Sequence, residues 1–102
     1  MVLALGLAGC ATVGANPSIS GMNSLLGSGV NFGNALEAPN EGDWGMTLQS
    51  EYFSLVRQGG FKTIRLPVSW TNHAAKTAPY TVDPKFFARV EWAINQATSQ
   101  GL

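Results

Sequence analysis

Two β-type segments alternate with two helix-type segments between residues 29 and 101, and this order constrains the fold more than any other feature of the chain. The first segment, residues 29–33, is a short β-favourable run bounded by glycines. In the second, residues 61–70, Ile64, Leu66 and Val68 occupy alternate positions, as in a strand with one apolar face. Strands that alternate with helices of this length argue for βαβ units. The order therefore predicts an α/β fold with a parallel sheet, either closed into a barrel or doubly wound.

Both predicted helices carry signals at their ends. Thr47 is predicted to cap a helix that runs to Gln58, after which two glycines stop it. The apolar stripe of this helix consists of Leu48, Tyr52, Leu55 and Val56. Asp83 and Pro84 predict the cap and the first turn of the other helix, which Gly101 ends. Its buried face is predicted to hold Phe86, Phe87, Val90, Ala93, Ile94 and Ala97.

The connection after the first strand, residues 34–46, combines turn residues with an unusual density of hydrogen-bonding side chains. Connections this long in compact domains are often functional. This connection also separates the glycines of the first strand from the predicted helix by about a dozen residues, so no helix N-terminus is placed to bind a pyrophosphate. The spacing therefore disfavours a dinucleotide-binding fold.

Arg65 occupies the second strand on the face opposite Ile64 and Leu66. In a (β/α)₈ barrel the apolar face of a strand meets the helices and the other face points toward the barrel axis. An unpaired guanidinium in that position is very costly. Arg65 is therefore predicted to pair with a carboxylate from another strand, which we expect beyond these 102 residues.

Charge and rare residue types exclude several classes of function. Six basic and six acidic residues give a formal net charge of zero, so the chain lacks the electrostatic footprint of a nucleic-acid-binding protein. The single cysteine, Cys10, cannot form an internal disulfide. His73 is the only histidine, which leaves no cysteine–histidine cluster for zinc. We expect no metal, no other cofactor and no nucleic-acid partner.

The first residues resemble a bacterial lipoprotein signal. Residues 1–9 are apolar, although no Lys or Arg precedes them as a secretory signal requires, and they are far shorter than the ~20 residues that cross a bilayer. The tetrapeptide Leu7-Ala8-Gly9-Cys10 resembles the lipobox, in which cleavage occurs before an acylated cysteine. We therefore predict a signal peptide over residues 1–9, a lipid anchor on Cys10, an uncharged tether over residues 10–27 and a folded domain over residues 28–102. The alternative for Cys10 is an ordinary buried cysteine.

Three blocks of the folded part are diagnostic: residues 29–45 (GVNFGNALEAPNEGDWG), residues 60–70 (GFKTIRLPVSW) and residues 79–83 (PYTVD). In order and spacing they resemble the amino-terminal third of glycoside hydrolases of family 5, of the cellulase or endo-β-1,4-glucanase type. The resemblance implies that residues 28–102 form the first two βα units of a (β/α)₈ TIM barrel, which they leave incomplete.

The resemblance also implies retaining hydrolysis of β-1,4-glucan, or of mannan in some members, by two glutamates at the ends of strands four and seven. Both glutamates would lie beyond this chain, which would then be inactive by itself. Arg65 matches the arginine that supports the nucleophile, and Asn34 and Glu37 match residues that line the glycone-side sugar subsites. The alternatives are a structural salt bridge for Arg65 and a solvated loop position for Glu37.

Three further residues keep two interpretations each. Trp44 and Trp70 either stack on sugar faces or pack against barrel and helices, and His73 is either a loop residue or a ligand contact.

Two hypotheses from different classes follow. The first is part of a glycosidase of the bacterial cell envelope, lipid-anchored through Cys10 or secreted, that acts on a β-linked polysaccharide or oligosaccharide. The second is a small surface lipoprotein that binds saccharide without hydrolysis. Against the second, two βα units leave strand edges that nothing closes.

Overall fold

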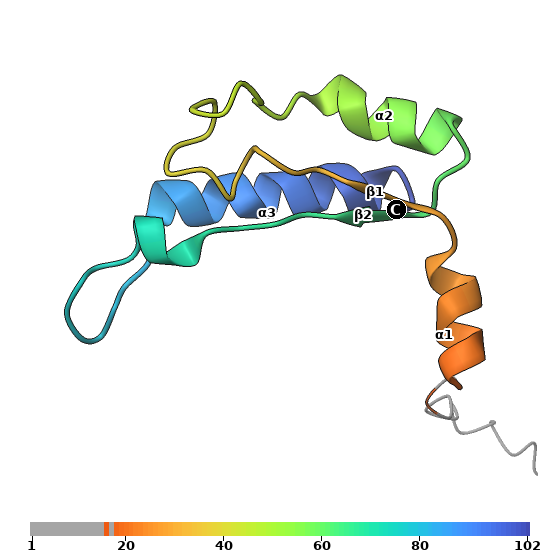
Figure 1. The fold of residues 1–102 in the computed structure, drawn as a ribbon, viewed down its shortest axis with the longest axis horizontal. Helices are drawn as coiled ribbons and strands as arrows, with labels where there is room; N and C mark the ends of the chain where they lie inside the picture. Colours follow the sequence, from red (N-terminus) through yellow and green to blue (C-terminus); the bar gives the residue numbers. More distant parts are fainter. Residues whose placement is uncertain (1–15, 17) are drawn as a thin grey trace, which may run out of the picture.

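The computed structural model describes residues 16 and 18–102. The predicted signal peptide, Cys10 and most of the first half of the predicted tether lie outside the described residues. Among the described residues no helix is both long and apolar enough to span a bilayer. The elements along the chain are α1 (Ile19–Leu26), β1 (Gly29–Asn31), α2 (Ser50–Gln58), β2 (Thr63–Arg65), the 3₁₀ helix η1 (Trp70–His73) and α3 (Pro84–Ser99) (Figure 1).

Strands β1 and β2 form a parallel pair joined by α2, as the sequence predicts. Their register places Val30 opposite Ile64 and Asn31 opposite Arg65. Both strands are shorter than predicted, since Pro67 has no backbone N–H for a ladder. The two segments nevertheless stay together past the ladder, because the Phe32 N–H donates to the Arg65 carbonyl at 2.9 Å and the Ser69 N–H donates to the Leu36 carbonyl at 3.0 Å.

The predicted orientation of the second strand is confirmed. Ile64, Leu66 and Val68 are partly buried against the core under α2 and α3. Arg65 is exposed on the opposite face of the sheet.

Helix α2 begins later than predicted, and the predicted cap at Thr47 is wrong. The N-cap residue is Gln49, whose side chain makes no capping hydrogen bond. The backbone of Leu48 is held outside the helix, because its N–H donates to Glu41 and its carbonyl accepts from Arg89. At the other end, Gly60 has a φ of 84°, a left-handed conformation that suits glycine after a helix.

Helix α3 has the predicted start, with Pro84 in its first turn and the Asp83 carboxylate accepting from the Lys85 N–H at 3.0 Å. The predicted buried face is only partly correct. Phe86, Val90 and Ala93 are buried, but Phe87 and Ile94 are each about half exposed, at 54% and 51%. The helix therefore has an apolar side that the described residues leave uncovered.

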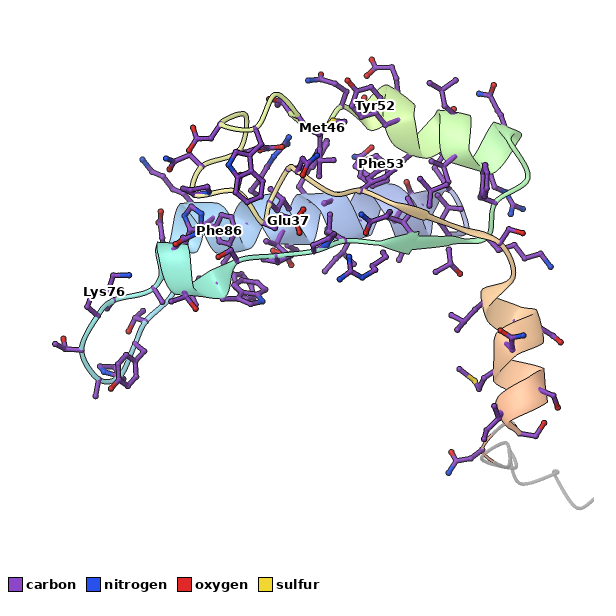
Figure 2. The ribbon with its side chains drawn as sticks, in the orientation of Figure 1. Glu37, Met46, Tyr52, Phe53, Lys76 and Phe86 are labelled. Carbon is purple, nitrogen blue, oxygen red and sulfur yellow. The ribbon has the colours of Figure 1, made fainter. Side chains whose placement is uncertain are left out.

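Phe53 of α2 lies at the centre of the core and is 1% exposed. Figure 2 labels Phe53 on the side of α2 that faces α3. The Phe53 ring meets Phe32 edge-on at 5.1 Å and Trp92 of α3 edge-on at 5.8 Å. The predicted stripe of α2 omits Phe53, whereas it includes Leu55, which is 60% exposed. The face of α2 that enters the core is thus rotated from the predicted one.

Helix α1 lies within the segment predicted as a tether. Its N-cap Ser18 accepts from the Gly21 N–H at 3.1 Å, and none of its residues is buried. It extends away from the two βα units (Figure 1). A hydrogen bond from the Thr63 hydroxyl to the Leu26 carbonyl joins its end to β2.

Candidate functional site

The connections that follow β1 and β2 emerge at the same end of the sheet, because the two strands are parallel (Figure 1). In barrels and open sheets of this class, ligands bind at the carboxyl ends of the strands. Asn34 and Glu37 lie just beyond β1, and η1 follows β2. This edge is therefore the candidate site.

Arg65 contacts Asn31 across the two strands. Its Nη1 donates to the Asn31 Oδ1 at 2.8 Å, and both residues lie on the sheet face that points away from α2 and α3. Within residues 18–102 Arg65 forms no ion pair. Its positive charge is thus held in place by a neutral amide and is still available to a carboxylate.

Glu37 is tied to the turn that carries Asn34. Its Oε1 accepts from the Asn34 N–H at 2.7 Å. Asn34 has a φ of 65°, a left-handed conformation that asparagine tolerates better than most residues do. Asn34 is exposed and Glu37 is half-buried, so both predicted sugar-contacting residues are accessible at this edge.

The rest of this connection is attached to α3 by an ion pair between Glu41 and Arg89. Arg89 Nε donates to Glu41 Oε2 at 2.8 Å and Arg89 Nη2 donates to Glu41 Oε1 at 2.9 Å. The same two residues bind the Leu48 backbone, with Glu41 accepting its N–H at 2.9 Å and Arg89 donating to its carbonyl at 2.8 Å. The guanidinium also lies 3.9 Å from the centre of the Trp92 ring.

These contacts set the charge state of Glu41. Burial acts to raise the pKa of Glu41, but the hydrogen bonds from Arg89 and the Leu48 N–H, together with the charge of Arg89, outweigh it and hold the pKa below its ordinary value. Glu41 is therefore an ionised structural carboxylate.

The structure places two of the remaining aromatic candidates in packing positions. Trp70 meets Phe86 edge-on at 5.7 Å, and the His73 ring stacks on Phe86 at 3.6 Å. His73 Nε2 is buried and has no hydrogen-bond partner among the described residues. For Trp70 these contacts favour the packing interpretation. For His73 they show a ring packed against α3, and a ligand contact stays a prediction. Trp44 is 54% exposed, so stacking on a sugar stays a prediction for that residue.

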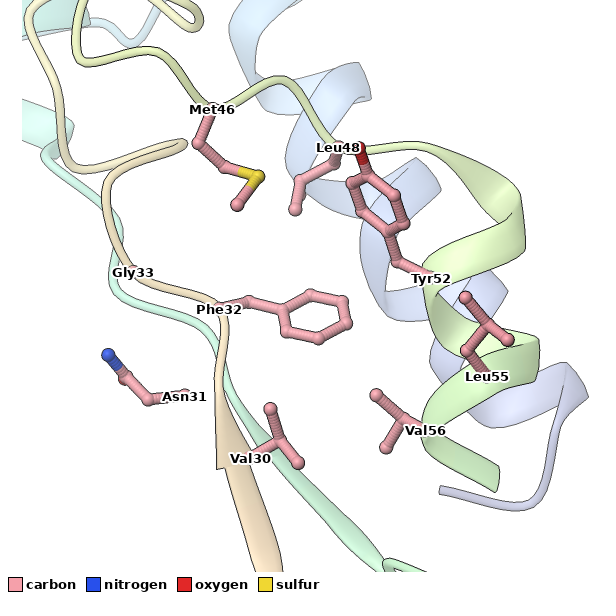
Figure 3. Close-up of a pocket in the computed structure, with 9 residues that line it drawn as sticks. All are labelled: Val30, Asn31, Phe32, Gly33, Met46, Leu48, Tyr52, Leu55 and Val56. Carbon is pink, nitrogen blue, oxygen red and sulfur yellow. The ribbon is translucent and has the colours of Figure 1, made fainter. Parts of the chain in front are cut away.

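A groove of about 290 Å³ lies between β1 and α2 (Figure 3). Val30 and Phe32 point into it toward α2, whereas Asn31 points the other way. The other side chains that line it are Met46, Leu48, Tyr52, Leu55 and Val56. Such a surface offers very few polar groups to a sugar, so this groove is not the candidate saccharide site.

Sequence reasoning missed Asn31 and Arg89. The signal for Asn31 was its position in the strand, because it alternates with Val30 and Phe32 and so shares a face with Arg65. No local pattern marks Arg89, because its partner Glu41 is separated from it by 48 positions.

Comparison with known proteins identifies the family. The family model described as Cellulase (glycosyl hydrolase family 5) matches residues 20–102. The chain belongs to glycosyl hydrolase family 5. The match begins inside the segment predicted as a tether and includes α1 except its first residue.

Curated relatives are also endoglucanases of bacteria. The chain is 43% identical over 76 residues to Endoglucanase H of Acetivibrio thermocellus, a stretch that covers 74% of this chain and 8% of that protein. It is 40% identical over 83 residues to Endoglucanase A of Paenibacillus barcinonensis, which covers 76% of this chain and 21% of that protein. This family 5 chain thus spans only 8% and 21% of the length of these two relatives.

Solved structures of the family share the fold. The chain superimposes on Cel5A of Thermotoga maritima in complex with cellobiose with a TM-score of 0.77 and 48% identity, over 78% of this chain and 26% of that one. Superposition on the complex of Cel5A with mannotriose gives the same TM-score, identity and coverage. The predicted fold is confirmed: the family 5 chain contains two βα units of a (β/α)₈ barrel.

Proposed function

We propose that these residues are part of a retaining glycoside hydrolase that cleaves β-1,4-glucan or mannan. The observation that carries the proposal is the 48% identity to Cel5A, a protein solved with both cellobiose and mannotriose. The strand-end position of Asn34, Glu37 and Arg65 supports it, since barrel enzymes assemble their sites at this end.

These residues have two proposed roles. Arg65 faces the barrel axis and binds the nucleophile carboxylate, which it keeps ionised and oriented. Asn34 and Glu37 bind hydroxyl groups of the glycone-side sugars. The two carboxyl groups of a retaining glycosidase stand ~5–5.5 Å apart, one acting as nucleophile and the other as acid/base. We assign neither role to Glu37, Glu41 or Asp43, because all three lie in the connection after β1.

In this proposal residues 1–102 belong to a chain that also contains the other strands and helices of the barrel, because two βα units cannot close a barrel. The groove of Figure 3 and the uncovered side of α3 are the apolar surfaces that further barrel elements would cover. The residues 1–102 alone are then expected to be inactive on cellulose derivatives and to unfold without a cooperative transition.

The test uses the protein encoded by the complete reading frame. We expect it to release reducing sugar from carboxymethylcellulose or glucomannan, with the β-anomer formed first in an NMR time course of a cello-oligosaccharide. An α-anomer as the first product would contradict the retaining mechanism. Binding of cello-oligosaccharides without any hydrolysis would instead favour the non-catalytic saccharide-binding lipoprotein.

We further propose that Cys10 anchors the protein in the bacterial cell envelope through lipid, at the outer membrane or the surface. The support is the sequence Leu7-Ala8-Gly9-Cys10 and the uncharged segment that follows it. The residue after the cysteine is Ala11 and not an aspartate, which supports sorting to an outer membrane.

A further inference from the structure

Asn31 and Arg65 form a connected pair at the start of the candidate site. Their strands place them directly opposite each other, and Arg65 Nη1 donates to Asn31 Oδ1 at 2.8 Å. An arginine side chain has considerable rotamer freedom, and one fixed hydrogen bond to a rigid strand restricts the directions in which the guanidinium can point.

Gly33 provides the space in which the Asn31 amide lies. A Cβ atom built on Gly33 would be 2.7 Å from Asn31 Nδ2 and 3.3 Å from Glu37 Oε1. Gly33 is not among the glycines with a left-handed φ, so the backbone itself does not demand glycine here. A side chain at this position is instead excluded by the Asn31 amide and the Glu37 carboxylate.

The chemistry of the partner matters as well as its position. A carboxylate at position 31 would form an ion pair with Arg65 and cancel much of its positive charge. An amide accepts a hydrogen bond from the same guanidinium nitrogen and leaves the positive charge of Arg65 uncompensated. The charged groups of this cluster are Arg65 on β2 and Glu37 in the connection after β1. Glu37 already accepts the Asn34 N–H, and within residues 18–102 it forms no ion pair with Arg65.

We propose that Asn31 is a positioning residue of the reaction, whose neutral amide aims Arg65 at the nucleophile, and that Gly33 is required because it makes room for this amide. The inference rests on the proposed function. It adds two residues, on β1 and just after it, to the group that sets the nucleophile in place.

The first test compares Asn31→Ala, Asn31→Asp and the exposed α3 control Asn95→Ala in the complete enzyme, with cellotetraose as substrate. Asn31→Ala should lower kcat about 10-fold with little change in KM, because the guanidinium is misplaced without being removed. Asn31→Asp should shift the acidic limb of the pH profile of kcat/KM to higher pH by about one unit, because the added negative charge disfavours ionisation of the nucleophile. Asn95→Ala should match the wild type.

A double-mutant cycle tests the role of Gly33. Gly33→Ala alone should lower kcat, since its methyl group displaces the Asn31 amide, and should also raise KM through its contact with Glu37. In the Asn31→Ala background the same change should have little further effect on kcat, because the displaced group is already gone. Additive losses in kcat would contradict the assignment of Gly33.

Thermal unfolding of every variant separates folding from positioning. If Asn31→Ala keeps wild-type kcat, or if Asn31→Asp lowers the Tm while the acidic limb stays in place, Asn31 is only structural and the inference is overturned. A wild-type enzyme that hydrolyses none of the β-glycans overturns the proposed function and the inference together. An active wild type with unaffected variants overturns the inference alone.

Discussion

Glu41 and Arg89 hold the backbone of Leu48 between them. The carboxylate accepts the Leu48 N–H and the guanidinium donates to the Leu48 carbonyl, while the two side chains form a bidentate pair with each other. The pair thereby fastens the end of the long connection after β1 to the middle of α3. It is only partly exposed, at 18% for the Glu41 side chain and 31% for that of Arg89, so water screens it less than an ordinary surface pair.

We predict that Glu41→Gln destabilises the complete protein by about 2 kcal/mol, because charge-assisted hydrogen bonds are lost and Arg89 keeps an unpaired charge. The measurement is urea unfolding at pH 7. The matched control is Glu91→Gln, an exposed residue of α3 with no ion pair among the described residues. Equal stability of both variants would show that the Glu41–Arg89 pair contributes nothing measurable.

The same pair predicts a pH dependence of stability. The pKa of Glu41 is lowered in the folded protein, so the folded state favours the ionised form more than the unfolded state does. The contribution of Glu41 is therefore fully present well above its unfolded pKa of about 4.3 and is lost as the pH falls through its folded pKa. We expect the free energies of unfolding of wild type and Glu41→Gln to converge as the pH falls below about 4.3 and on through the lowered folded pKa. A constant difference across this range would contradict the assigned charge state.

For Arg65 we predict that lysine is a poor replacement. Lysine keeps the positive charge but cannot donate to Asn31 and to a carboxylate through one planar group. Arg65→Lys should lower kcat by at least ~10²-fold, as is typical for loss of one preorganised electrostatic contact, with a much smaller change in KM. The measurement is steady-state kinetics on cello-oligosaccharides, with circular dichroism to verify the fold. Near-wild-type kcat in a folded variant would mean that Arg65 does not face the nucleophile.

Glu37 and Asn34 should affect binding more than turnover. Glu37→Ala removes a carboxylate that accepts the Asn34 N–H, so we expect it to raise KM for longer cello-oligosaccharides through both the lost sugar contact and a looser turn. Asn34→Ala is expected to have the same effect, but alanine also strains the left-handed backbone, and Asn34→Gly separates these causes. Glu51→Ala on the exposed start of α2 is the control. A uniform loss of kcat without a change in KM would argue against sugar-binding roles.

For Cys10 we predict lipid modification in the mature protein. Cells that express the complete protein should incorporate a fatty-acid probe into it and retain it in the membrane fraction, and Cys10→Ser should abolish both. If the serine variant is labelled and retained as well as the wild type, the lipoprotein assignment is wrong.

Local patterns in the sequence determined the order of the elements and the faces of the strands. Asp83 and Pro84 identify the start of α3, and the alternation of Ile64, Leu66 and Val68 identifies the helix-facing side of β2. These features are predictable because capping involves neighbouring residues and because the strand period of two relates residues only two positions apart.

Tertiary structure alone decided where α2 begins and which side chains meet at the site. Thr47 is a residue type that often caps helices, but the backbone N–H and carbonyl of Leu48 are bound by Glu41 and Arg89, so Leu48 stays outside the helix. The Asn31–Arg65 contact likewise needs the register of two strands that are 34 positions apart along the chain. The physical reason is common to both: each contact joins residues distant in sequence, and their approach depends on how the helices pack against the sheet, which no local period encodes.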